Sequence, residues 1–280
     1  MRNTIKISAL LAAVALFGAE ARAQFAYSTG DLLLNFRYTD TADGSFGASD
    51  VEIDLGNVNT FLSTHSASGT YDLTSLLTFP GSTKTLASIN NTPNSGATLD
   101  GISFSATAVI DPGNVVQTKL WATSTRGSGP LVAQSGGVEA QAGQAIDGVG
   151  NGGNNSYQAV ANRLGTANAV KVGDAGAGSY HTFVGTDNSG TFGGFMNKSV
   201  ETTTPAGFTG SVAADLFYLP SGATAQQLGY FTFGTGDGAH GALSYTVSAV
   251  PEPASYGVVA GLGLLALAMR RQIRRLPTAL

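Results

Sequence analysis

The sequence predicts an all-β fold, and three observations indicate this. The 280 residues include 38 glycines, as suits a chain of many tight turns. Charged residues make up only 11% of the chain, against about a quarter in typical proteins. Short stretches in which apolar and polar residues alternate recur between glycine-rich turns. We expect a β-sandwich or jelly-roll with a short helical insertion, flanked by an N-terminal signal helix and a C-terminal membrane helix.

The first 23 residues are typical of a signal peptide. Two basic residues open the chain, an apolar run follows from Ile7 to Ala19, and Ala21 and Ala23 are the small residues that signal peptidase reads. We expect cleavage after Ala23. The alternative, an uncleaved N-terminal anchor, is less favoured because charged residues follow the apolar run.

Residues 24–249 are long enough for one large extracytoplasmic β-rich domain or two small ones, and we expect one. The clearest hairpin joins 102–110 to 115–122 through a turn at Asp111–Asn114. The stretch Asp72–Leu77 fits either a short helix or a strand. Apolar runs and alternation together predict strands at 32–38, 51–55, 102–110, 115–122, 180–184, 211–219, 228–233 and 243–247.

The amino-acid composition changes in the middle of the chain. Val138–Ile146 and Tyr157–Leu164 are rich in alanine and glutamine with weak helical spacing, and the Gly-Asn tract Gly148–Asn155 separates them. We expect two short helices around a loop. They mark either a domain boundary or an insertion across one end of the sandwich.

Charge and cysteine content exclude several classes of function. Seven of the 14 basic residues but only two of the 18 acidic ones lie in the terminal segments, which leaves residues 24–250 at a net charge of −9. Such a surface argues against binding nucleic acid or anionic lipid. The absence of cysteine excludes disulfides, thiol catalysis and cysteine metal sites.

No catalytic constellation emerges, and we expect the protein not to be an enzyme. His65, His181 and His240 are far apart, and neither a zinc-protease motif nor a nucleophile elbow is present. A carboxylate-dependent hydrolase needs two facing acids. Glu52 and Asp54 are expected to share a solvated strand face, so that class is the least favoured.

Two binding hypotheses remain open. Loops at Asp40–Asp50 and Gly234–Gly241 bring oxygen ligands near glycines, so calcium is the one cofactor left open, although neither loop matches an EF-hand. No metal ligand is assigned. A surface polysaccharide is the alternative ligand, and it would need an aromatic strip formed by Tyr230 with Trp121 or Phe233.

The tail at residues 250–280 has three parts in a fixed order. Pro251, Glu252 and Pro253 form a turn-like segment, because proline cannot donate a backbone hydrogen bond. The uncharged apolar run 256–269 predicts a membrane helix, about 21 Å long at ~1.5 Å per residue, with arginine stems reaching the interface. A basic cytoplasmic end then stops the span, with Arg270, Arg271, Arg274 and Arg275.

This order resembles the PEP-CTERM sorting signal of exported bacterial proteins, carried here by Pro251, Glu252, Pro253 and the arginines. The resemblance implies that exosortase, a membrane-embedded cysteine transpeptidase, cuts near the motif and passes the protein to the cell surface. The resemblance implies where the protein is delivered, and it implies no biochemical activity. The early segments GDLLLNFRYTD and DVEIDLGN are similar to the start of many PEP-CTERM proteins and add only the context of export.

The sequence therefore predicts an exported cell-surface or extracellular-matrix protein of structural or adhesive type. Its expected partners are signal peptidase, exosortase and the membrane, with no nucleic acid. Its expected location is the cell envelope, where the C-terminus anchors it transiently or permanently.

Overall fold

The computed structural model describes residues 27–39, 46–79, 85–89, 98–131, 136–151, 157–162, 169–174, 180–184, 191–192, 196–220, 225–236 and 238–248. The described residues from Tyr27 to Val247 belong to one compact unit, and Ser248 belongs to a second. The signal peptide expected at 1–23 and the membrane helix expected at 256–269 lie outside these ranges.

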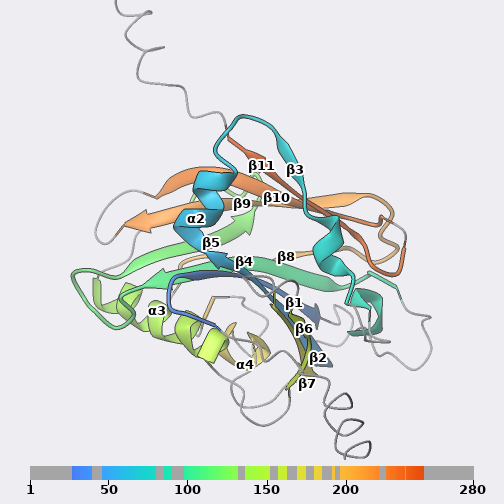
Figure 1. Cartoon of the computed structure of the whole chain (residues 1–280), viewed down its shortest axis with the longest axis horizontal. Coiled ribbons are helices and arrows are strands. Elements are labelled where there is room, and N and C mark those ends of the chain that lie inside the picture. Colours follow the sequence, from blue (N-terminus) through green and yellow to red (C-terminus); the bar gives the residue numbers. More distant parts are fainter. Residues whose placement is uncertain are drawn as a thin grey trace, which may run out of the picture. The chain divides into compact units, whose positions relative to one another are not determined.

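Strands dominate the described residues and join into one antiparallel sheet (Figure 1). Its order is β3-β11-β10-β9-β5-β4-β1-β2-β7-β6, and β8 pairs with β4 off this path. The all-β prediction is confirmed, but one continuous sheet replaces the two sheets of a sandwich or jelly-roll. The strands are β1 (Asp31–Thr39), β2 (Phe46–Asn57), β3 (Thr70–Asp72), β4 (Ile102–Ile110), β5 (Lys119–Thr125), β6 (Tyr157–Asn162), β7 (Ala169–Asp174), β8 (Thr202–Thr203), β9 (Ser211–Pro220), β10 (Gln226–Gly234) and β11 (Ala242–Val247).

The sheet curls until its two halves face each other across a shared core. It is continuous because β5 pairs with β4 on one side and with β9 on the other. The ring centroids of Phe36 in β1 and Phe233 in β10 are 5.5 Å apart. In a flat sheet these strands, four places apart, would be about 19 Å from each other at ~4.8 Å per strand. Phe104 of β4 also contacts Phe233, at 5.7 Å.

Helices cover the opposite face of the central strands (Figure 1). The helix α3 (Gly136–Asn151) lies against β4 and β5, and the short helix α4 (Tyr180–Val184) lies against β1 and β2. A second apolar core fills this layer, with Leu33 of β1 and Ile146 of α3 among its members. The central strands are therefore buried on both faces, which explains the uninterrupted apolar run at Leu32–Leu34.

Short elements complete the first core. Asn57 ends β2 and caps the helix α2 (Val58–Thr64), because its side-chain oxygen accepts hydrogen bonds from two backbone N–H groups of that helix. The stretch left open between helix and strand contains both, since β3 ends at Asp72 and the 3₁₀ helix η1 (Thr74–Leu77) follows. A second 3₁₀ helix, η2 (Leu86–Ile89), adds buried apolar residues.

Several local predictions are confirmed. The hairpin of β4 and β5 forms with Ile110 opposite Lys119, although its return strand begins at Lys119 and not at 115 as expected, and the last hairpin joins β10 to β11. The helix expected at 138–146 is α3. It continues through Gly148 and Gly150, where a loop was expected, and packing explains this: a Cβ atom there would lie 2.6 Å from Phe183 and 2.3 Å from Tyr27.

Two local predictions are wrong. The helix expected at Tyr157–Leu164 is the strand β6, which pairs with β7, and β7 in turn pairs with β2. The strand expected at Tyr180–Val184 is the helix α4. Local propensity misleads in both places, because α4 is capped by acids of the distant β2, and β6 pairs with the neighbouring β7, which joins the sheet through β2.

Replacing Phe233 with alanine tests the curled core. The ring is fully buried against Phe36 and Phe104, so Phe233→Ala should lower the free energy of unfolding by about 3–5 kcal/mol. Urea denaturation measures this. The matched control is Val116→Ala, because Val116 is 79% exposed and should change stability by less than about 0.5 kcal/mol. Equal effects of the two substitutions would contradict the packing.

Candidate functional site

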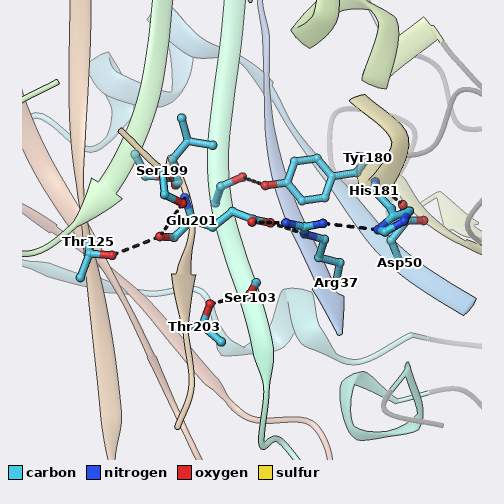
Figure 2. A network of polar contacts seen from close by, with 12 residues as sticks. Arg37, Asp50, Ser103, Thr125, Tyr180, His181, Ser199, Glu201 and Thr203 are labelled. Carbon is cyan, nitrogen blue, oxygen red and sulfur yellow. Dashed lines mark hydrogen bonds and ion pairs between the residues drawn. The ribbon is translucent and has the colours of Figure 1, made fainter. Parts of the chain in front are cut away.

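A group of polar side chains is buried between the central strands and α4 (Figure 2). Those on β1, β2 and β4 alternate with apolar residues and therefore project from the sheet face opposite the first core; the others come from α4 and from the residue before β8. We call this group the Arg37 cluster. Its members are Arg37, Asp50, Glu52, Ser103, Ser105, Tyr180, His181 and Glu201.

An ion pair between Arg37 and Glu201 lies at the centre of the cluster. Arg37 donates from Nε to Oε1 of Glu201 at 2.7 Å and from Nη2 to Oε2 at 2.5 Å. The two side chains are 1% and 5% exposed. A bidentate, charge-assisted pair of this kind satisfies a guanidinium that could not be buried alone. It joins β1 to the segment that leads into β8.

The carboxylates of β2 hold the start of α4. The backbone N–H of Tyr180 donates to Oε1 of Glu52 at 3.2 Å, and that of His181 donates to Oδ2 of Asp50 at 3.1 Å. The first N–H groups of a helix lack partners within it, so these acids cap α4. Burial also raises the pKa of Tyr180, whose hydroxyl lies 2.6 Å from Oγ of Ser105.

His181 lies at the partly exposed edge of the cluster. Its Nδ1 is 3.4 Å from Nη1 of Arg37. Because a guanidinium only donates, Nδ1 must accept, and the ring is then neutral with its proton on Nε2. Burial, and next the charge of Arg37, lower the pKa of His181. The geometry and the charge therefore favour the same neutral form.

The prediction of a solvated acidic face on β2 is wrong. Glu52 and Asp54 do share a face, but they are 0% and 2% exposed, so this face is buried and not solvated. Burial raises the pKa of Asp54 to about 7, and the nearby Asp31 adds to the shift. Asp31, whose pKa burial also raises, accepts a hydrogen bond from the N–H of Ser28 at 2.8 Å.

The three aromatic residues proposed for a polysaccharide site do not form one strip. Trp121 is 4% exposed and stacks on Tyr218 at 4.9 Å, and Phe233 is fully buried in the first core. Tyr230 projects from the other face of its strand, beside Asp215, and the guanidinium of Arg126 lies 3.4 Å from its ring centroid. Two of the three rings are thus unavailable to a ligand.

The histidines and acids of the described residues do not gather into a metal site. No group of three or more such side chains within this part of the chain could hold an ion. His65 packs between Phe61 and Tyr71, with ring centroids 4.4 and 4.6 Å away. Of the two proposed calcium loops, residues 40–45 of the first and Asp237 of the second lie outside the described ranges.

The residues predicted for sorting also lie outside the described ranges: Ala21, Ala23, Pro251, Glu252, Pro253, Arg270, Arg271, Arg274 and Arg275. Within the part that the structure describes, no helix is long and apolar enough to cross a membrane. The last described strand, β11, ends at Val247, just ahead of the sorting segment.

A double-mutant cycle tests the ion pair of the cluster. Arg37→Met and Glu201→Leu should each lower the free energy of unfolding by about 3–5 kcal/mol, since each breaks a buried, bidentate ion pair and leaves the other charge in place. The double variant should lose clearly less than the sum of the two. Arg126→Ala is the control, because its pair with Asp215 at 3.9 Å is half exposed and should be worth at most about 1 kcal/mol. Additive losses at Arg37 and Glu201 would refute the coupling.

Asp54→Asn should stabilise the protein at alkaline pH. The pKa of Asp54 rises from 3.8 to about 7 on folding, so its stabilising contribution is present below pH 3.8 and is lost as the pH rises through 7. An amide needs no proton, and the gain near pH 8 should be about 1–3 kcal/mol, falling to almost nothing near pH 4. Denaturation curves at both pH values measure it. The exposed Asp72→Asn is the control, and a loss of stability at pH 8 in Asp54→Asn would contradict the assignment.

Comparison with known proteins finds one feature. Residues 249–275 match a family model described as the PEP-CTERM protein-sorting motif, and the match contains the Pro-Glu-Pro segment, the apolar run and all four arginines of the predicted stop. No curated protein and no solved structure matches the chain. The match shows that the chain carries a PEP-CTERM protein-sorting motif, and it supports export to the cell envelope as a substrate of exosortase.

Proposed function

We propose that residues 24–249 form a non-catalytic structural or adhesive domain of the cell surface or extracellular matrix. The match to the sorting motif at 249–275 is the observation that carries this proposal. A protein with such an address acts where exosortase delivers it. The domain ahead of the motif is then the part that remains at the surface and meets other molecules there.

Signals at the two ends of the chain direct the proposed export and sorting. Signal peptidase cleaves after Ala23, and exosortase then recognises Pro251, Glu252 and Pro253. The apolar run 256–269 holds the protein in the membrane until that step, with the arginines on the cytoplasmic side. Anchoring is transient if exosortase removes the tail and permanent if the tail stays.

The buried polar groups support a structural role over a catalytic one. The acids and the arginine that could have served chemistry are engaged in structural contacts: Glu201 bonds to Arg37, and Glu52 and Asp50 accept from the backbone of α4. A general acid or nucleophile needs a position from which it can reach a substrate. Groups buried to this degree instead fix one segment of the chain against another.

The mass of the protein recovered from the cell surface tests the proposed route. In a host with exosortase, the surface form should begin at Gln24 and end near Pro251–Pro253. In the same host without exosortase, that form should be absent. A surface form that keeps residues 270–280 in both strains would instead make the tail a permanent anchor, and exosortase processing would be disproved.

Two variants separate recognition from folding in that experiment. Replacing Pro251, Glu252 and Pro253 together with alanine should abolish the processed form, while leaving cleavage after Ala23 unchanged. Asn114→Ala, at the distant turn between β4 and β5, should be processed as efficiently as the unaltered protein. Normal processing of the triple variant would show that exosortase does not read these residues.

A further inference from the structure

Three described stretches of the chain lie on the helical face of the sheet and contribute to its second core. Together we call them the strap; they are residues 180–184, 191–192 and 196–204. Its buried apolar residues all belong to the second core, together with Leu33 and Phe217 of the sheet. They are Tyr180, Val184, Phe192, Met196 and Val200. The strap therefore seals an apolar surface that the sheet would otherwise expose to water.

Polar contacts attach the strap to the sheet at several places (Figure 2). Thr203 lies 2.6 Å from Ser103 of β4, oxygen to oxygen, and the hydroxyl of Thr123 in β5 donates to the carbonyl of Val200 at 2.7 Å. These contacts involve groups that keep one charge state near neutral pH. Glu201 and His181 provide the contacts to Arg37.

His181 is the histidine of the strap, and its surroundings favour the neutral ring over the protonated ring. The charged groups on its packed neighbours are Arg37 from β1, Asp50 and Glu52 from β2, and Glu201 from the strap itself. From α3, the contact is made by Gly148 beneath Phe183. The acid next to it, Asp147, bonds to Thr29 and Asn151.

Protonation of His181 would remove an attachment and add a repulsion. A protonated ring has no acceptor nitrogen, so Nδ1 could no longer accept from Nη1 of Arg37. It would also place a second positive charge next to a guanidinium that is 1% exposed. Glu201 already makes two bonds to Arg37 and compensates only in part, since the pKa of His181 remains lowered.

We propose that His181 makes the strap an acid-responsive latch, which stays closed while the ring is neutral and loosens when the ring takes up a proton. Because folding lowers the pKa of His181, its stabilising contribution is fully present above the ordinary histidine value. It is lost as the pH falls through the lowered value. Loosening exposes the apolar side chains beneath the strap.

Hydrogen exchange of the full chain, followed by mass spectrometry, tests the latch. Protection of peptides covering 180–184 and 196–204 should fall about tenfold between about pH 7.5 and about pH 5, after correction for intrinsic rates. Peptides from β9 and β10 should keep theirs. Unchanged protection of the strap, or an equal loss across the whole sheet, would overturn the proposal.

A matched pair of variants assigns the effect to one ring. His181→Asn keeps an acceptor oxygen near the position of Nδ1 but cannot titrate, so its strap should stay protected at both pH values. His65→Asn removes a histidine that packs on Phe61, far from the strap in sequence, and should behave like the unaltered protein. An equal loss of protection in His181→Asn at acid pH overturns the proposal. If the strap of His181→Asn is unprotected even at pH 7.5, the result for the unaltered protein decides. A loss of protection at acid pH that is confined to the strap supports the proposal, and an equal loss across the whole sheet overturns it.

Discussion

The ion pair of Arg37 and Glu201 is the interaction on which the second face of the sheet depends. Arg37 projects from the centre of a strand that is buried on both sides, where an unpaired charge costs several kcal/mol. The carboxylate of Glu201, brought to it from elsewhere in the chain, accepts two hydrogen bonds from that charge. The segment that carries Glu201 must therefore dock, and in docking it brings Val200 into the second core and pairs β8 with β4. Charge compensation and apolar burial are completed in the same step.

The first core is held together by shape, without covalent links. The chain has no cysteine, so contacts between strands distant in the sheet rest on packing alone. Phenylalanines from β1, β4 and β10 meet across the curl, and Phe61 of α2 contacts Phe231 and Tyr245 at 6.2 and 5.2 Å. Large rings from both halves make a continuous contact that small side chains could not. These aromatic side chains are buried in the interior. Trp121 and Phe233 therefore do not contribute to a strip of aromatic rings on the surface.

A structural feature could be predicted from the sequence when the residues that determine it lie close together in the chain. The hairpin of β4 and β5 was predictable because its alternation and turn residues are adjacent in sequence. The helix at Tyr180 was not, because the acids that cap it are 128 and 131 residues away. The Arg37 cluster was missed for the same reason, since its central pair spans 164 residues. One local signal was present: Asn35 and Arg37 interrupt an otherwise apolar strand, and a lone charge in such a run indicates a buried partner. The sorting motif was predictable because its parts are contiguous.

The position of β11 bears on how the domain carries mechanical load. This strand is the last of the domain, and it is held on both sides, by six paired residues of β10 and by three of β3. The backbone N–H of Val247, its final residue, also donates to Gly69 at 3.1 Å. A pull on the C-terminal end would reach β11 first. Because the tension would run along a strand clamped between two neighbours, hydrogen bonds of both ladders would have to break together, and a domain built this way resists shear better than one that ends in a free edge strand.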